Sequence, residues 1–432
     1  MNLEDSNEIK NYINQICAEV RNKRVHEEIK EELKSHLKEK ATEYLNCGKN
    51  ENEALKLAIN EMGSSKHIGQ ELNELHKGNF EWSITLLCIT LVLLSIGTIY
   101  CFEINGSFEK VFGGYSNYIL NKSILWSIIG LMGLLIGCFI DYRKIKKYSL
   151  HIYIIGLILL CLVFLSPEVN GVVQWLQIGH ISINMGYLGP ILFIIALSGI
   201  YCNYKWSNKK NIIKGLLLGI IPLILLSMTG SLYSFLIYSI ALIIVSYISK
   251  APKKILGIFA IIEALILFLT KIRFNIIGFF INNGNDLNNS SYIHDQLKTI
   301  RDSSVLIGKA ENFNKNGLPN FYSDYMFSYI VYNFGWIAGF IVIILITTLL
   351  IKIYRISKNI KNNYGSTLIL GIASILGIQF IGHLLSNLGF INGNVPLPFI
   401  SYGGTAMVFN MFIIGIIINV YKGRSISRIE LS

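Results

Sequence analysis

Ten apolar stretches follow one another along most of this chain, and each is long enough to cross the roughly 30 Å of hydrocarbon in a bilayer as a helix. Hydrophobic residues make up 52% of the 432 residues and charged residues only 15%, far from the averages of soluble domains. The sequence therefore predicts an all-α polytopic membrane protein with ten transmembrane helices. The predicted segments are roughly 82–101, 121–140, 150–166, 185–203, 211–227, 231–249, 254–272, 325–351, 365–386 and 399–421.

Basic residues favour one side of the predicted bundle. The loops on the side of the N-terminal segment carry groups of lysine and arginine, whereas the short loops of the opposite side carry few or none. By the positive-inside rule, the N-terminal segment and the C-terminal tail, residues 423–432, are cytosolic. The formal net charge of +11 then arises mainly from the basic residues of the cytosolic loops, and no nucleic-acid partner is needed to explain it.

The first 78 residues predict a separate, cytosolic helical domain. Apolar residues recur at helical spacing in two stretches above charged faces, and Asn50 with Glu53 forms a capping box before a third helix that Gly63 ends. A fourth helix is expected at 65–76. No cleavable signal peptide opens the chain, because this segment is charged and amphipathic. The run "HEEIKEELKSHLKEK" is interpreted as a solvated helix face, since its His and Glu alternate with lysines.

One connection is much longer than the others. Residues 273–324 lie between the seventh and eighth predicted helices, on the side opposite the N-terminal domain, and loops of this length are usually functional or disordered. A disordered linker would be poorer in Ile, Leu, Tyr and Phe. We therefore expect a folded, amphipathic lid that rests at the bilayer interface.

The entrance to the tenth helix has an unusual sequence, "VPLPFISYGGTAM", at residues 395–407. Pro396 and Pro398 prevent a regular helix there. Irregular backbone at membrane depth is tolerated only where protein groups or water in a cavity bond to its N–H and C=O groups. Either a helix break that packs against its neighbours or a binding site for a pyrophosphate or sugar fits this pattern. In the second case the residues that face the cavity are Ser401, Tyr402, Gly403 and Gly404.

This tail stretch, with "SDYMF" at the eighth helix and "YIHDQLKTIRDSSVLIGK" before it, resembles the shape, elongation, division and sporulation (SEDS) family, which includes RodA, FtsW and SpoVE. The resemblance covers roughly residues 82–422, including the ten crossings and the large loop. It implies a peptidoglycan glycosyltransferase of the bacterial plasma membrane that polymerises lipid II beside a class B penicillin-binding transpeptidase, in cell shape or cell division. The N-terminal segment resembles the helical prefix domains of some bacterial permeases, which implies an unknown cytosolic partner.

The position that matches the catalytic aspartate of the family is Asp324, in "LPNFYSDYMFSYI". As a general base, its carboxylate would take the proton of the acceptor sugar hydroxyl while that hydroxyl attacks the donor. Partial desolvation at the interface would raise the pKa of the carboxyl toward working pH. The structural alternative is an N-cap, since an aspartate directly before an apolar helix is a common cap.

The resemblance also implies a set of substrate-binding residues around this base. Cations are needed opposite the departing pyrophosphate, and an ordinary interfacial role remains the alternative for each of them. A divalent cation is a candidate to share the task, but His294 with Asp295 is too weak a pair for a ligand set, and the seven cysteines predict neither a disulfide framework nor a zinc site. The implied binding residues are Arg273, Gln296, Lys309, Trp175, Ser401, Tyr402, Gly403 and Gly404. Lys298 and Arg301 are further candidate cations that the resemblance does not support.

Several positions depart from the family pattern. Much of its inner network of charged residues is replaced by uncharged ones, so a polymerase with a retuned pocket and a relative that binds lipid-linked sugar without turning it over both remain open. The replacements are Gln174, Tyr187, Pro190, Gly230, Tyr332 and Asn333.

Two intramembrane residues have no counterpart in this scheme. Glu263 lies within "GIFAIIEALILFLT" and His383 lies within the ninth helix, and ionisable groups at such depth are functional candidates. Together they could form a proton relay, and the alternative is a protonated Glu bonded to a neighbouring helix. Three functions therefore remain: a glycosyltransferase, a non-catalytic scaffold or regulator of wall synthesis, and a flippase or transporter.

Overall fold

The computed structural model describes residues 6–21, 23, 26–75, 81–105, 108, 117–169, 171–179, 181–281, 285–310, 318, 320–391 and 395–423. At residues 28, 75, 181, 271–281 and 285–291 it describes the backbone alone. The chain divides into two compact units. One holds residues 1–80 together with 421–432, and the other holds residues 81–420.

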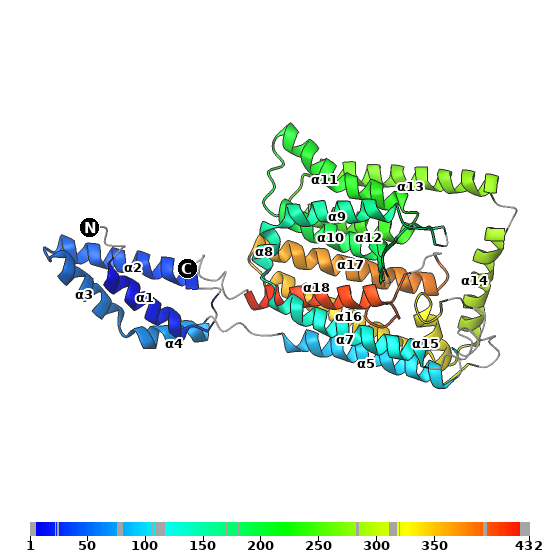
Figure 1. The fold of residues 1–432 in the computed structure, drawn as a ribbon, viewed down its shortest axis with the longest axis horizontal. Helices are drawn as coiled ribbons and strands as arrows, with labels where there is room; N and C mark the ends of the chain where they lie inside the picture. Colours follow the sequence, from blue (N-terminus) through cyan, green and yellow to red (C-terminus); the bar gives the residue numbers. More distant parts are fainter. Residues whose placement is uncertain are drawn as a thin grey trace. The chain divides into compact units, whose positions relative to one another are not determined.

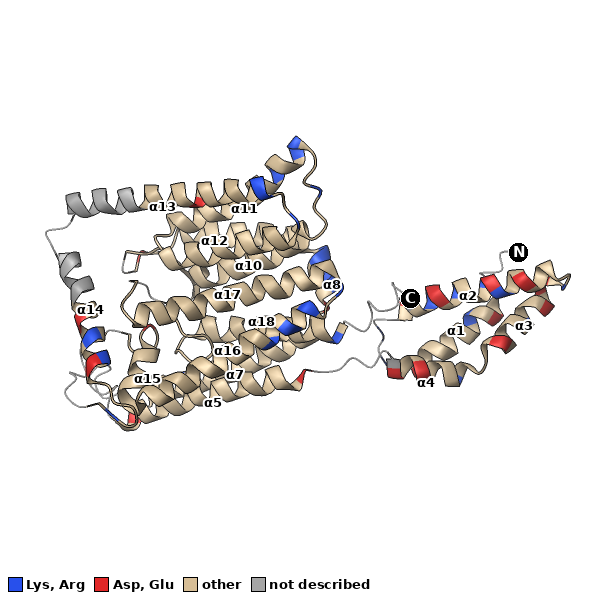
Figure 2. Cartoon of the chain, turned by 180° about the vertical axis from the view of Figure 1, so that it is seen from behind, with Lys and Arg blue, Asp and Glu red and all other residues tan. Residues whose placement is uncertain are grey.

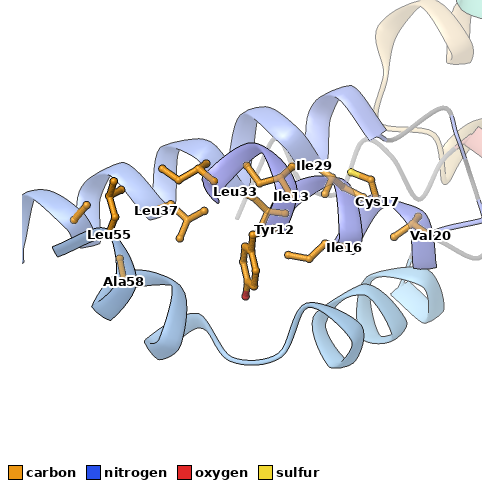
Figure 3. Packing of buried hydrophobic residues seen from close by; sticks show 12 residues of the cluster. Tyr12, Ile13, Ile16, Cys17, Val20, Ile29, Leu33, Leu37, Leu55 and Ala58 are labelled. Atoms are coloured by element: carbon orange, nitrogen blue, oxygen red, sulfur yellow. The ribbon is translucent and has the colours of Figure 1, made fainter. Parts of the chain in front are cut away.

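The N-terminal unit consists of helices packed around a core of its own. Apolar side chains of three helices meet around Ile13 and Leu37 (Figure 3). Asn50 caps the third helix as predicted, because its Oδ1 accepts the N–H of Glu53 at 2.9 Å, and Gly63 ends the helix with φ of 95°. The four helices are α1 (Asn7–Glu19), α2 (His26–Asn46), α3 (Glu51–Met62) and α4 (Ser65–Leu75).

The second unit is a bundle whose long helices run side by side (Figure 1). Its helices are α5 (Trp82–Ile104), α7 (Tyr118–Phe139), α8 (Tyr142–Lys147), α9 (Ser149–Val163), α10 (Met185–Tyr201), α11 (Lys209–Met228), α12 (Leu232–Ile248), α13 (Lys253–Ile281), α14 (Asn285–Ser303), α15 (Met326–Phe334), α16 (Trp336–Lys358), α17 (Asn363–Asn387) and α18 (Gly404–Lys422). Within the described part of the chain, six helices are long and apolar enough to span a membrane, namely α5, α7, α11, α16, α17 and α18, and α9, α10 and α12 are shorter apolar helices. The polytopic helical fold is confirmed, and the count of ten crossings stays a prediction.

The eighth predicted segment, 325–351, is not one helix. It is divided at Gly335, which has φ of 87° and separates α15 from α16. A Cβ atom at this position would lie 2.9 Å from the Cα of Ile307, so both the backbone angle and the space require glycine. The carbonyls of Val305 and Leu306 accept the N–H groups of Trp336 and Ile337, at 3.0 and 3.2 Å, and thereby satisfy the free donors of the first turn of α16.

Three further features differ from the predicted pattern. The fold is not purely α, because strands β1 (Trp175–Ile178) and β2 (Ile181–Asn184) form an antiparallel hairpin before α10. The long connection at 273–324 is partly helical, since α13 continues to Ile281 and α14 follows it. The last helix begins at Gly404 rather than near residue 399, because the two prolines of the preceding segment prevent helical hydrogen bonding.

Helices α7 and α18 cross at a pair of glycines. A Cβ atom at Gly137 of α7 would lie 3.0 Å from the Cα of Gly415 of α18, and a Cβ atom at Gly133 would lie 3.2 Å from the carbonyl of Val408. Small residues allow two helix backbones to approach this closely in a membrane, where van der Waals packing replaces the hydrophobic effect. This contact places α18, and the irregular segment before it, against the bundle.

We expect Gly137→Leu to separate α7 from α18 and to lower the free energy of unfolding by about 1–3 kcal/mol, the usual range for overpacking. The measurement is the thermal unfolding midpoint of the protein in detergent. Gly97→Leu is the matched control, because Gly97 lies within α5 and a Cβ there would meet nothing within 4 Å. Equal midpoints for the two variants would contradict the role of the crossing.

Candidate functional site

Asp324 lies in a tight turn directly before α15. The N–H groups of Ser323 and Asp324 both donate to the carbonyl of Asn320, at 2.9 Å, and Asn320 has φ of 51°, an unusual angle for a residue other than glycine. The hydroxyl of Ser323 donates to Asp324 Oδ1 at 3.1 Å. The carboxyl-bearing residue is only 8% exposed, so this turn holds a buried acid.

The Asp324 side chain does not cap α15. The N-cap residue is Tyr325, and no side chain of the turn accepts the first N–H groups of the helix. Two side chains of α17 accept them instead, because Phe327 N–H donates to His383 Nε2 at 3.3 Å and Ser328 N–H donates to Asn387 Oδ1 at 3.0 Å. The capping alternative for Asp324 is therefore wrong.

Burial raises the pKa of the Asp324 carboxyl to about 6, and hydrogen bonds from Ser323 and Asn320 oppose this effect. Removal from water disfavours the charged form, whereas donors to the carboxylate favour it. A pKa slightly below neutral leaves the group ionised at neutral pH and still basic enough to accept a proton.

The segment before α18 is folded against this turn. Ser401 Oγ accepts the N–H of Leu397 at 2.8 Å and donates to the carbonyl of Ser323 at 2.5 Å. The N–H of Tyr402 donates to the carbonyl of Tyr322 at 2.9 Å, and the rings of Tyr322 and Tyr402 meet edge to face, 5.5 Å apart. The two irregular segments, although far apart in the sequence, thus form one hydrogen-bonded structure.

Phe399 lies at the centre of the segment before α18 with φ of 66°. A bulky residue in the left-handed region is strained, and such residues persist only where their surroundings hold them. Here the ring is 2% exposed, and the next residue, Ile400, accepts a hydrogen bond from Ser95 of α5 at 2.6 Å.

Helix α17 carries a stripe of buried polar residues that faces both segments. Gln379, His383 and Asn387 are spaced by four residues, and none is more than 4% exposed. Gln379 Nε2 donates to the carbonyl of Pro396 at 3.0 Å, and His383 Nδ1 bonds to the carbonyl of Val395 at 2.6 Å. The stripe therefore satisfies backbone groups that the irregular segments leave without helical partners.

The two backbone partners of His383 define its protonation state. A carbonyl only accepts, so Nδ1 carries the proton toward Val395, and an N–H only donates, so Nε2 is the acceptor for Phe327. Both ring nitrogens are thus occupied by backbone groups, and the predicted relay with Glu263 has no free nitrogen on His383. Glu263 is 7% exposed, and its Oε1 has no partner among the described residues.

The structure joins some of the predicted site residues to Asp324 and leaves others apart. Ser401 and Tyr402 are bonded to the Asp324 turn. Gly403 and Gly404 follow directly, and a Cβ at Gly404 would lie 2.6 Å from the indole ring of Trp126. The glycine at 404 is therefore required by packing.

The other predicted binding residues lie elsewhere in the fold. Trp175 is half-buried on β1 and Gln296 is half-buried on α14. Lys309 is exposed, on a segment whose neighbours Gly308 and Ala310 donate to the carbonyls of the last turn of α15. The side chain of Arg273 lies outside the described residues.

Helix α14 is attached to the end of α17. Arg301 donates to the carbonyl of Leu388 at 2.9 Å, and the ring of His294 occupies the space beside Gly389, where a Cβ atom would lie 3.1 Å from it. Leu297 and Ile300, on the same helix, are buried. Arg301, a candidate cation in the sequence, thus serves to hold α14 in place.

An uncharged polar network takes the place of the charged residues that the family pattern predicts. Tyr187 on the buried helix α10 bonds to Gln379 at 2.9 Å and also to Asn410 of α18. A Cβ atom at Gly186 would collide with Gln174 Oε1 and with the hydroxyl of Ser234, so these two polar side chains lie against the backbone of α10. Among the described residues, no group of three His, Cys, Asp or Glu side chains could hold a metal ion.

Sequence reasoning missed the residues that hold Asp324 in place, above all Asn387, Ser323 and Asn320. One signal was available, since Gln379, His383 and Asn387 recur every four residues in an otherwise apolar helix. Such a stripe predicts a buried polar face. Its partners, however, lie on other elements.

Ser401→Ala should lower the free energy of unfolding by about 1–3 kcal/mol, because it leaves the buried N–H of Leu397 without an acceptor. The unfolding midpoint in detergent measures this. Ser198→Ala is the control, since the Ser198 hydroxyl only bonds back to the carbonyl of Ile194 on its own helix, at 2.7 Å. Indistinguishable midpoints for the two variants would show that Ser401 does not hold the segment.

Fold and site together define a polytopic helical membrane protein with a buried acidic turn at one end of its bundle. A family model described as "Cell cycle protein", of FtsW, RodA and SpoVE, matches residues 84–426. The chain belongs to this FtsW/RodA/SpoVE family.

Individual relatives agree with this assignment. The chain is 24% identical over 377 residues to a protein of Geobacter metallireducens named "Probable peptidoglycan glycosyltransferase FtsW", with 82% of this chain and 98% of the relative covered. It is 25% identical over 368 residues to "Stage V sporulation protein E" of Bacillus subtilis, with 78% and 96% covered.

Solved structures share the fold. A chain from the work "Structural coordination of polymerization and crosslinking by a peptidoglycan synthase complex" is similar with a TM-score of 0.64 at 17% identity, covering 80% of this chain and 98% of that one. The rod shape determining protein RodA of Thermus thermophilus gives a TM-score of 0.60 at 17% identity, covering 80% and 97%.

Proposed function

We propose that this protein is a peptidoglycan glycosyltransferase that polymerises lipid II into glycan strands for the cell wall, with Asp324 as the general base. One observation carries the proposal: a carboxyl group only 8% exposed that serves neither as a helix cap nor, among the described residues, in a salt bridge. Buried acids are rarely left without a charged partner. The names of the FtsW relatives support the same reaction.

In the proposed reaction, Asp324 accepts the proton of the sugar hydroxyl as that oxygen attacks the anomeric carbon of the lipid-linked donor. The polyprenyl pyrophosphate leaves with the bonding electrons, and its charge requires cations nearby. Arg273 and Lys309 are the proposed cations, and Gln296 and Trp175 are proposed to contact the sugars.

The orientation of the bundle supports a reaction at the outer face of the membrane. In the second unit, lysines and arginines gather at the end that holds α8, and α14 and α15 lie at the opposite end (Figure 2). By the positive-inside rule the α8 end is cytosolic, so Asp324 faces outward, where glycan strands are made. A class B penicillin-binding transpeptidase is the proposed partner, in keeping with the similarity to a chain of a peptidoglycan synthase complex.

Asp324→Asn should reduce the rate of lipid II polymerisation by about 100-fold or more, because the amide cannot accept the proton. Purified protein is incubated with lipid II, and glycan strands are resolved on a gel. Asp302→Asn is the control, since Asp302 is exposed on α14 of the same long connection and should retain activity. Full activity of Asp324→Asn would refute the proposed base and favour a scaffold role.

The rate should rise with pH through about 6, because the pKa of Asp324 is raised and only the ionised carboxylate acts as a base. Asn320→Gly keeps the positive φ without strain and removes a hydrogen bond that lowers this pKa, so the rising limb should move to higher pH. The profile is measured as initial polymerisation rate from about pH 5 to about pH 8. A limb that stays in place would show that another group limits the reaction.

A further inference from the structure

Asn387, at the C-terminal end of α17, connects the reactive turn to a second transmembrane helix. It is 4% exposed, and all its amide bonds go to groups of the protein. Its oxygen accepts the N–H of Ser328 at 3.0 Å and the hydroxyl of Ser328 at 2.9 Å. Because a backbone N–H can only donate, this amide atom is oxygen, and the orientation of the side chain is defined.

The amide nitrogen consequently faces the opposite way, toward Asp324. It donates to the main-chain carbonyl of Asp324 at 3.1 Å and to the carbonyl of His383 at 2.9 Å. The Asp324 carbonyl is one bond from the Cα atom that carries the carboxyl group. A bond to this carbonyl therefore restrains the backbone at Asp324 and the direction of its Cα–Cβ bond, from which the carboxyl group extends.

The turn is held from two sides. On one side Ser401 and Tyr402 bond to the carbonyls of Ser323 and Tyr322. On the other side, among the described residues, the only side chain recorded on the Asp324 carbonyl is Asn387. The N–H of Asp324 bonds within the turn itself, to Asn320, and does not anchor the residue to another helix.

We propose that Asn387 is a positioning residue for the reaction, which orients the Asp324 carboxylate through its main-chain carbonyl. This inference rests on the proposed function, because it concerns the orientation of the catalytic carboxylate and not the binding of substrate. A displacement of about 1 Å at a reacting group can reduce a rate by about 100-fold. Loss of the amide donor should therefore lower kcat by about 10- to 100-fold and leave KM for lipid II nearly unchanged.

Two substitutions separate positioning from helix capping. Asn387→Asp keeps an oxygen acceptor for Ser328, and so keeps the cap on α15, but loses the donor to Asp324 wherever its new carboxyl group is ionised. Asn387→Leu loses both. We expect kcat to fall in both variants. The unfolding midpoint should fall less in Asn387→Asp than in Asn387→Leu, because only the aspartate keeps the cap on α15.

The control is another buried asparagine that joins two elements. Asn419 is fully buried in α18, donates to the carbonyl of Cys138 at 2.6 Å and accepts the N–H of Tyr142 at 3.4 Å. Asn419→Leu should lower the unfolding midpoint and leave kcat of the folded protein unchanged. Full-length protein in detergent with lipid II as substrate is used throughout.

The outcomes distinguish the two proposals. Wild-type kcat in the folded Asn387→Leu protein, or in Asn387→Asp at a pH where its new carboxyl group is ionised, would overturn the positioning role, because the donor would then be dispensable. If Asp324→Asn is inactive in the same assay, the proposed function stands on its own. Activity in Asp324→Asn would overturn both.

Discussion

The structure of the site depends on hydrogen bonds to the backbone N–H and C=O groups of two irregular segments inside an apolar bundle. The turn at 320–325 and the segment at 395–403 cannot form helical hydrogen bonds, and unpaired backbone groups in such surroundings are costly. Ser401 joins the two segments, and the stripe on α17 bonds to both. A cluster of neutral side chains thus makes it possible for a carboxyl group to remain at the end of a membrane bundle.

The neutrality of this cluster has electrostatic consequences. A lysine or arginine next to Asp324 would lower the pKa of its carboxyl and weaken it as a base. The side chains that bond to or pack on the turn are instead those of serine, asparagine and tyrosine. Among the described residues no cation forms an ion pair with Asp324, and burial raises the pKa of its carboxyl to about 6.

Features that depend on neighbouring residues could be predicted from the sequence. The apolar character of the helices, the cap at Asn50 and the break before the last helix are local properties, and the structure contains each of them. The division at Gly335 was missed because hydropathy continues across it, and its cause is the approach of residues 305–307. Asn387 was missed because its partner Ser328 is 59 residues away in the sequence. The spacing of residues within one helix cannot predict a hydrogen bond to another helix.

The distance in sequence between Asp324 and the side chain that holds it also has a bearing on biosynthesis. The bond from Asn387 to Asp324 joins residues 63 positions apart, and Ser401 follows later still. While the chain emerges from the ribosome, α15 enters the membrane before either partner has been made. The Asp324 carboxylate acquires its final orientation only when the last two helices have been inserted, so an incomplete chain lacks the complete hydrogen-bonded turn.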